Sequence, residues 1–175
     1  MIASPQLLDP NFARSVVLMV QHDEGGAMGL VLNQPSETRV KEVWEQVSET
    51  ACEAEGYLYH GGPCEGPLMV VHTDESLSEM EIVPGLYFSA EKESVQQIAA
   101  GGERRAKFFV GYAGWGPGQL EAEMEEGAWL AAPASDETIF SEDEDEWRKA
   151  FEAAAGARPF PWVDPKLIPD DPSVN

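Results

Sequence analysis

The chain has 175 residues, of which 43% are hydrophobic and 9% aromatic, so it is long enough for one domain with its own core. Its formal net charge of −21 leaves no basic patch to neutralise phosphates, which argues against direct binding to nucleic acid and to anionic membrane surfaces. It has no apolar run near the ~18 residues that a membrane span needs, no secretion signal, and two cysteines without metal or redox spacing, which together favour the cytoplasm.

The first predicted elements are strands at residues 15–21 and 27–33, the first of them apolar and rich in β-branched side chains. Residues 22–26 lie between them and supply two glycines for a turn, so we expect an antiparallel hairpin that ends at Pro35. Thr38 is the expected N-cap of the helix that follows, because apolar residues recur beyond it at helical spacing.

Four short strands are predicted in the middle of the chain, at residues 57–60, 68–72, 81–83 and 86–89. A Gly-Gly-Pro sequence separates the first two, and we expect them to pair as a hairpin around it. A Pro-Gly sequence separates the last two and is typical of a type II turn, which predicts a second hairpin there.

The next helix is expected to begin at Ser89 or Ala90 and to end at the glycine pair 101–102. A buried strand at residues 107–112 follows it. That strand leads into a segment at 111–118 with four glycines and a proline, which also carries two large aromatic side chains. We expect this segment to form a loop, followed by an acidic helix at residues 119–126.

Short strands are predicted at residues 128–132 and 137–140, before a last helix that has an acidic first turn and ends at Gly156. Because strands outnumber helices and helices fall between groups of strands, we expect one α+β domain at residues 1–156 with a mixed, largely antiparallel sheet. Residues 157–175 are rich in proline and are expected to form an irregular C-terminal tail, partly docked through its aromatic side chains.

The chain resembles the bacterial YqgE/AlgH family in a series of short motifs that keep their order along residues 3–155. These motifs are Ala3-Ser4-Pro5, Asp9-Pro10-Asn11-Phe12, Arg14-Ser15-Val16-Val17, His22, Gly26-Ala27-Met28-Gly29-Leu30, Asn33-Gln34-Pro35, Gly61-Gly62-Pro63, Leu68, His72, Gly111-Tyr112-Ala113-Gly114-Trp115, Gly118-Gln119-Leu120-Glu121, Glu123, Trp129, Phe140 and Trp147. The ending at residues 168–175 also resembles one branch of the family.

The resemblance implies an α+β fold whose sheet is split or barrel-like and is surrounded by helices. It implies no biochemical activity, because none is established for the family, although one member gave it the label of a transcriptional regulator. This chain departs from the pattern at two places. The usual glycine-containing lead-in before Ile2-Ala3 is missing, so we expect a short first strand, and Cys64 replaces an aliphatic residue.

The glycine-rich segment and its neighbours form the candidate site, for which two interpretations stay open. In one, the two aromatic rings fill the core beside a tight turn. In the other, a small ligand or a partner binds a pocket there. The segment matches neither the phosphate-binding P-loop nor the dinucleotide-binding turn, so we expect no nucleotide and no other cofactor. The residues of the candidate site are Asn33, Gly61, Gly62, Tyr112, Trp115, Gln119 and Glu121.

Neither a metal centre nor a catalytic residue is predicted elsewhere. His22, His60 and His72 lack the spacing of metal ligands, so we interpret them as ordinary turn histidines. Ser15 lies in no nucleophile motif and has no base next to it in the sequence. Arg14 is expected to pair with a carboxylate such as Asp9 or Glu121 and to act on stability.

The leading functional hypothesis is a non-enzymatic interaction or regulatory protein that acts through protein contacts or a small ligand at the candidate site. The alternative is an enzyme that acts on a small molecule in the same pocket. Direct DNA binding, which the family label suggests, is the third hypothesis and is disfavoured by the charge.

Overall fold

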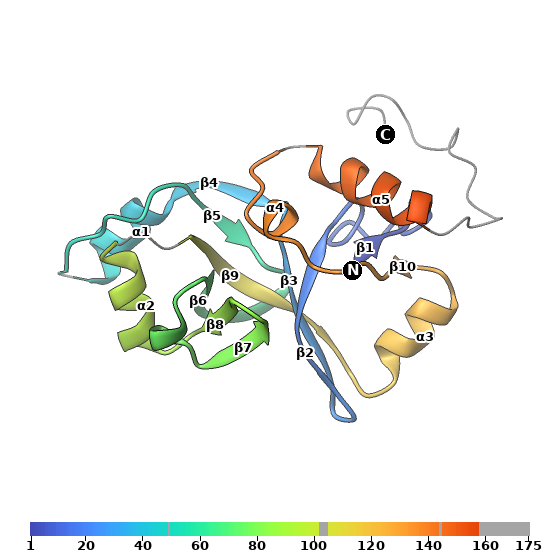
Figure 1. Cartoon of the computed structure of the whole chain (residues 1–175), viewed down its shortest axis with the longest axis horizontal. Coiled ribbons are helices and arrows are strands. Elements are labelled where there is room, and N and C mark those ends of the chain that lie inside the picture. Colours follow the sequence, from blue (N-terminus) through green and yellow to red (C-terminus); the bar gives the residue numbers. More distant parts are fainter. Residues whose placement is uncertain (49, 102–104, 144, 158–175) are drawn as a thin grey trace.

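The computed structural model describes residues 1–175 except 49, 102–104, 144 and 158–175 (Figure 1). Its main sheet has eight strands, of which six follow one continuous path. In spatial order these six are β2 (Val17–Asp23), β3 (Gly26–Val31), β9 (Ala106–Trp115), β6 (Cys64–His72), β8 (Leu86–Ser89) and β7 (Met80–Val83). All neighbours on this path pair antiparallel, which confirms the expected α+β class and the largely antiparallel sheet.

The remaining strands make the sheet mixed and bring it close to a closed barrel. β5 (Tyr57–His60) pairs parallel with β9, and β4 (Pro35–Arg39) pairs antiparallel with β5. The two end strands of the path, β2 and β7, approach each other without pairing, so the barrel has an open seam between them. β1 (Ile2–Ala3) is short, as expected, and forms a separate two-stranded sheet with β10 (Trp129–Leu130).

Two of the three expected hairpins are confirmed, and the third is wrong. β2 pairs with β3, and β7 pairs with β8 around Gly85, whose φ of 83° suits the predicted type II turn. β5 and β6, however, do not pair with each other, because β9 lies between them and pairs with both. The backbone groups on both edges of the apolar strand β9 need hydrogen-bond partners, which β5 and β6 supply. Local turn signals between β5 and β6 carry no information about a strand as distant in sequence as β9.

The described helices cover the outside of the sheet. α1 (Val40–Val47) and α2 (Lys92–Ala99) lie together at one end, and α3 (Gln119–Glu125) lies at the opposite end (Figure 1). α5 (Glu146–Ala157) lies beside β1, and a single 3₁₀ turn, η1 (Glu75–Leu77), precedes β7. The end of α2 is confirmed: Gly101 has a φ of 97° and donates its N–H to the Ile98 carbonyl.

The strand predicted at 137–140 is wrong, because Asp136–Ile139 forms the short helix α4. Ser135 caps this helix by accepting a hydrogen bond from the Thr138 N–H at 3.3 Å. The apolar and β-branched residues of this segment favoured a strand, so the capping serine was overlooked.

Other element boundaries are shifted by a few residues. β10 is shorter than the predicted strand at 128–132, and Pro35 begins β4 rather than ending a hairpin. Arg39, not Thr38, precedes α1, because the backbone stays extended up to Arg39. Gly156 lies inside the last turn of α5. The expected tail lies, apart from Ala157, outside the described residues.

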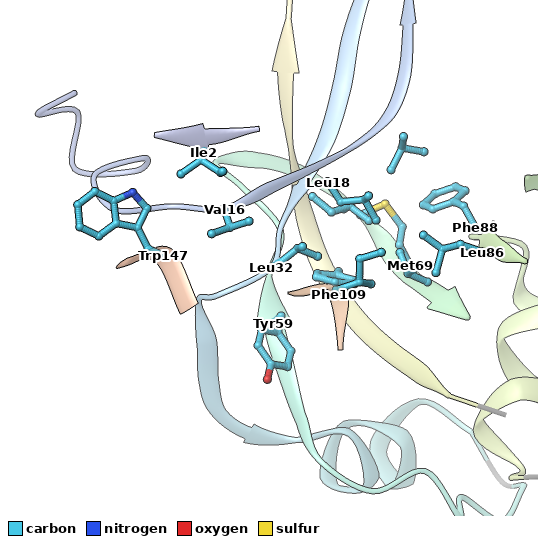
Figure 2. Close-up of a cluster of buried hydrophobic side chains, with 14 of the residues drawn as sticks. Ile2, Val16, Leu18, Leu32, Tyr59, Met69, Leu86, Phe88, Phe109 and Trp147 are labelled. Atoms are coloured by element: carbon cyan, nitrogen blue, oxygen red, sulfur yellow. The ribbon is translucent and has the colours of Figure 1, made fainter. Parts of the chain in front are cut away.

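Three groups of buried side chains hold the layers together. The largest lies inside the sheet and under α4 and α5, where Leu18 lies next to Met69 and Ile2 lies next to Val16 (Figure 2). A second group packs α1 and α2 on the outer face of β5, β6 and β9. The third packs α3 and the N-terminal segment around Trp115 and Trp129. Burial of these apolar side chains is the main favourable contribution to folding.

Candidate functional site

The glycine-rich segment does not form the expected loop. Residues 111–115 continue β9, and only residues 116–118 turn toward α3. Gly111, with a φ of 69°, marks the point where β9 exchanges one neighbour for another: β5 pairs with residues 108–110, and β3 pairs with residues 113–115. The glycine therefore supplies the backbone conformation that this exchange requires.

Gly61 and Gly62 lie against the same point of β9. A Cβ atom on Gly61 would lie 2.2 Å from the Gly111 carbonyl oxygen, and one on Gly62 would lie 2.3 Å from the carbonyl carbon of Tyr112. The N–H of Gly61 donates to the Val110 carbonyl, and its own carbonyl accepts from the Val31 N–H, both at 2.9 Å. Three strands thus meet through backbone atoms at a place where no side chain fits.

Asn33 fastens the loop before β2 to the end of β3. Its side-chain oxygen accepts from the Val16 N–H at 2.8 Å, and its amide group donates to the Arg14 carbonyl at 2.9 Å. Arg14 has a φ of 57°, an uncommon backbone conformation for a residue with a side chain, and its guanidinium lies 5.9 Å from the centre of the Trp147 ring.

Trp115 is buried beside Phe12 and Trp129 around one carboxylate, that of Glu123. Glu123 accepts hydrogen bonds from the indole N–H of Trp115 at 3.0 Å and of Trp129 at 2.8 Å, and from the Gln119 amide at 2.9 Å. Burial by itself would raise the pKa of Glu123, but the three donors outweigh it and hold the pKa below its ordinary value. These contacts match the interpretation in which the Trp115 ring fills the core.

The Glu121 carboxylate lies within hydrogen-bond distance, 2.6 Å, of Nε2 of His22 on β2, and both side chains are about half exposed. Gln119 accepts from the Gly116 N–H at 3.0 Å and so closes the turn before α3. The structure therefore joins Gly62 to Tyr112, Gly61 to Gly111, and Gln119 to Trp115 through Glu123. The polar side chains Asn33, Gln119 and Glu121 all bond within the protein.

A feature that the sequence reading missed is an apolar cleft of about 600 Å³ at the seam of the barrel. Its volume lies within the range typical of ligand sites. The cleft is lined by residues 1–2, 16–19, 32, 82–83, 131–135, 138–139, 150 and 153–154. Among these described lining residues, Ser135 and Thr138 carry the polar side chains, and none has a titratable side chain. Met1 adds its α-amino group, which donates to the Val17 carbonyl and whose pKa burial lowers to about 6.

Separate segments of the chain build the cleft, which is why no local motif revealed it. β1 and β2 form one wall, Ile82 and Val83 of β7 form another, and α5 contributes Ala150, Ala153 and Ala154. The segment Ala131-Ala132-Pro133-Ala134 runs along it with all four residues exposed. An exposed run of small apolar residues after a strand was the signal that could have indicated it.

A second, smaller pocket of about 220 Å³ contains Lys107 of β9. The buried Lys107 amine donates to the carbonyls of Ile139 at 3.2 Å and Ser141 at 2.8 Å, and lies 4.0 Å from the centre of the Tyr59 ring. Burial lowers the pKa of Lys107 to about 8, although Glu142 and Glu146 oppose the shift. The lysine thus ties the segment after α4 to the sheet.

No group of three or more His, Cys, Asp or Glu side chains could hold a metal ion among the described residues. His22 pairs with Glu121, and the buried His72 lies 3.0 Å from the Ser89 hydroxyl. Cys52 and Cys64 are both free thiols. None of the described helices has both the length and the apolar character needed to cross a membrane.

Comparisons with known protein families, sequences and structures all indicate the same family. A profile described as AlgH-like matches residues 1–158. A UPF0301 protein of Chlorobaculum tepidum is 38% identical over 166 residues, which cover 89% of this chain and 85% of the relative. A UPF0301 protein of Xanthomonas campestris is 41% identical over 158 residues, which cover 86% and 84%. The solution structure of the AlgH protein of Pseudomonas aeruginosa superposes with a TM-score of 0.73 at 37% identity, over 89% of this chain and 86% of that one.

Proposed function

This chain belongs to the AlgH-like family, and we propose that it is a non-catalytic binding protein whose cleft between β2, β7 and α5 holds an apolar group. The group would come from a protein partner or from a small ligand. The observation that carries this proposal is the cleft itself, which is large enough for a ligand and has walls of aliphatic side chains.

The chemistry of the cleft supports binding rather than catalysis. General acid–base and nucleophilic steps need a titratable or activated side chain next to the reacting atoms. The described lining residues offer two hydroxyl groups, Ser135 and Thr138, and the α-amino group of Met1, which donates to the Val17 carbonyl; neither histidine nor carboxylate lines the cleft beside them. A hydrophobic ligand would instead gain stability from the apolar surface that it removes from water.

A regulatory role would then act through other proteins. The net charge of −21 opposes close approach to DNA, so a regulator of this composition would change the activity of a partner rather than occupy an operator. The free thiols Cys52 and Cys64 fit a reducing compartment, which supports the cytoplasm as the place where this happens.

We assign the residues of the candidate site predicted from the sequence to the scaffold that holds the cleft in shape. Asn33 fastens the chain just before β2, whose residues 17–19 line the cleft. The glycines 61, 62 and 111 fix the exchange of strands beside β9. This assignment predicts that ligands contact the residues of the cleft. The surroundings of the Tyr112 and Trp115 rings should stay unchanged when a ligand binds.

The test is the fluorescence of N-phenyl-1-naphthylamine, an uncharged probe that emits strongly in apolar surroundings. We expect saturable binding at one site per chain. Ala153→Gln places a polar amide at the cleft wall from an exposed helical position, and it should weaken binding about tenfold, or about 1.4 kcal/mol. Ala122→Gln, at an exposed position of α3 away from the cleft, is the matched control and should bind as the parent does. Equal affinity in both variants, or no saturable binding, would contradict the proposal.

A further inference from the structure

The cleft at the seam has an apolar floor that is continuous with the protein core. Five of its lining residues also belong to the largest group of buried side chains, and each is at most 5% exposed; they are Ile2, Val16, Leu18, Leu32 and Ile139. Figure 2 labels the first four of them. A ligand that reaches this floor meets aliphatic side chains and is removed from water there.

The rim of the cleft is polar at one place, the start of α4. Ser135 is exposed, Thr138 is partly exposed, and Thr138 directly precedes Ile139 of the floor. The Ser135 hydroxyl donates to the Thr138 hydroxyl oxygen at 3.2 Å. Within the described part of the chain, the Thr138 hydroxyl donates to no acceptor, so its hydrogen can bond to an oxygen atom of a ligand. An apolar floor beside a hydroxyl donor suits a molecule with an apolar chain and an oxygen-containing head group.

The lining of the cleft offers no countercharge for a charged head group. None of the described lining side chains is titratable. The α-amino group of Met1 also lines the cleft, but it donates to the Val17 carbonyl, and burial lowers its pKa to about 6. This amine is therefore mostly uncharged above pH 7. A charged head group would lose hydration without gaining a partner of opposite charge, so the lining favours an uncharged one.

The shape and composition of the floor favour a chain over a flat ring system. No aromatic side chain is among the described lining residues, whereas the smaller pocket at Lys107 contains Tyr57, Tyr59 and Phe140. Stacking on ring faces is therefore absent from the cleft, while methylene groups gain from contact with any apolar surface. Residues 16–19 line the cleft over about 10 Å at the usual rise of a strand, which is long enough for an extended chain.

We propose that the ligand of the cleft is a free, uncharged amphiphile, namely a long-chain aliphatic alcohol or ester. Its oxygen accepts a hydrogen bond from the Thr138 hydroxyl, and its chain lies on the floor between β2, β7 and α5. A free molecule is favoured over a lipid in an anionic membrane, because the net charge of −21 opposes approach to such a surface. The inference rests on the proposed function, since it names the class of ligand that the same cleft takes.

The experiment uses the full chain at pH 8 and measures the displacement of N-phenyl-1-naphthylamine by straight-chain primary alcohols from hexanol to decanol. We expect the Kd of the alcohol to fall about fourfold for each added methylene group, which corresponds to about 0.8 kcal/mol. Decanoate and decylammonium should each bind at least tenfold more weakly than decanol. All three are compared in about 0.3 M NaCl, which screens the overall charge of the protein.

Variants at position 138 test the hydrogen bond to the head group. Thr138→Val keeps the shape of the side chain but removes the donor, so it should weaken decanol binding about three- to tenfold. Thr138→Ser, the matched control, keeps the hydroxyl group and should bind decanol more tightly than Thr138→Val does. Circular dichroism checks that both variants are folded.

The outcomes separate this inference from the proposed function. Suppose that the naphthylamine binds at the cleft, but the affinity for alcohols does not rise with chain length, or a charged compound binds as tightly as decanol, or Thr138→Val binds decanol as the parent does. The uncharged amphiphile is then wrong and the binding cleft stands. If the naphthylamine does not bind, the proposed function fails as well.

Two further results would assign the cleft to another occupant. A Trp162→Ala variant that binds decanol several-fold more tightly than the parent would assign the cleft to the chain's own C-terminal segment. A self-association that Ala153→Gln abolishes would assign it to a second copy of the chain. Either result overturns the proposal.

Discussion

At the scale of single residues, the Glu123 side chain makes more hydrogen bonds than any side chain singled out from the glycine-rich segment. Its carboxylate accepts from two indoles and from Gln119, and glutamine offers only one acceptor oxygen in its place. We expect Glu123→Gln to lower the free energy of unfolding at pH 7 by about 1–3 kcal/mol, as measured by urea denaturation. Glu125→Gln, an exposed change on the same helix, is the control and should stay within about 0.5 kcal/mol.

The pH dependence of the same variant checks the cause. The folded protein holds the pKa of Glu123 below the ordinary 4.5, so its carboxylate stabilises the fold above that value. The contribution is lost as the pH falls through the lower pKa of the folded state. The difference in stability between the parent and Glu123→Gln should therefore shrink below pH 4.5, and a difference that stays constant to pH 3 would contradict this account.

Lys107 gives a prediction of opposite sign. Its pKa of about 8 in the folded state lies below the ordinary 10.5, so the unfolded chain binds more protons between these values. Stability that depends on Lys107 must then increase as the pH rises from about 8 to 10.5, by at most about 3 kcal/mol. Thermal unfolding of the parent and of Lys107→Met should show this rise in the parent only. Parallel pH profiles would show that the lysine is not held in its buried position.

Residue chemistry was only partly predictable from the sequence. The aromatic and glycine content of 111–118 indicated that rings and backbone were fixed together there, and the burial of Trp115 agrees with that. Glu123 and Lys107 gave no local signal, because the indole partners of Glu123 lie on β9 and β10 and the carbonyl partners of Lys107 lie far along the chain. The Lys107 carbonyl partners at Ile139 and Ser141 follow it by 32 and 34 residues.

At the scale of elements, the exchange of strands along β9 depends on glycine at fixed places. A methyl group on Gly61 would meet the Gly111 carbonyl oxygen at 2.2 Å, a contact that only a backbone shift relieves. We expect Gly61→Ala to cost at least about 3 kcal/mol or to prevent folding, as judged by circular dichroism and thermal unfolding.

Gly156→Ala is the matched glycine substitution with the opposite expectation. Gly156 lies in α5, and a Cβ there meets no described atom within 4 Å. Alanine in a helix is more stable than glycine by about 0.5–1 kcal/mol, so this variant should melt at a higher temperature than the parent. If Gly61→Ala melts no lower than the parent, the exchange of strands does not require the glycine.

Element types followed from local patterns where the signal was complete within the segment. The β2–β3 and β7–β8 hairpins have their turns in sequence, and α2 has its glycine stop. The predicted pairing of β5 with β6 was wrong, because β9, which is distant in sequence, pairs with both. The strand predicted at 137–140 was wrong, because Ser135 caps a short helix there. Local propensity loses to tertiary pairing in strands more readily than in helices.

At the scale of the whole molecule, the resemblance to the AlgH-like family anticipated the barrel-like sheet, while the cleft could not be anticipated. Its walls come from β1, β2, β7, α5 and the segment after β10, which no linear motif unites. The acidic composition was visible in the sequence, and it is the reason why we propose a partner other than a polyanion. The sheet, the cleft and the composition together describe an acidic, nearly closed barrel with an apolar cleft at its seam.

The most direct test of the binding cleft is a methyl chemical-shift map of the full chain, recorded by NMR during titration with N-phenyl-1-naphthylamine. We predict that the largest changes fall on the methyl groups of Met19, Ile82, Val83, Ala132 and Ala153, which line the seam between β2, β7 and α5. The methyl groups of Ala113 and Ala122, near Trp115 and on α3, should stay unchanged. Changes centred on Ala113 and Ala122, with the seam unaffected, would contradict the account.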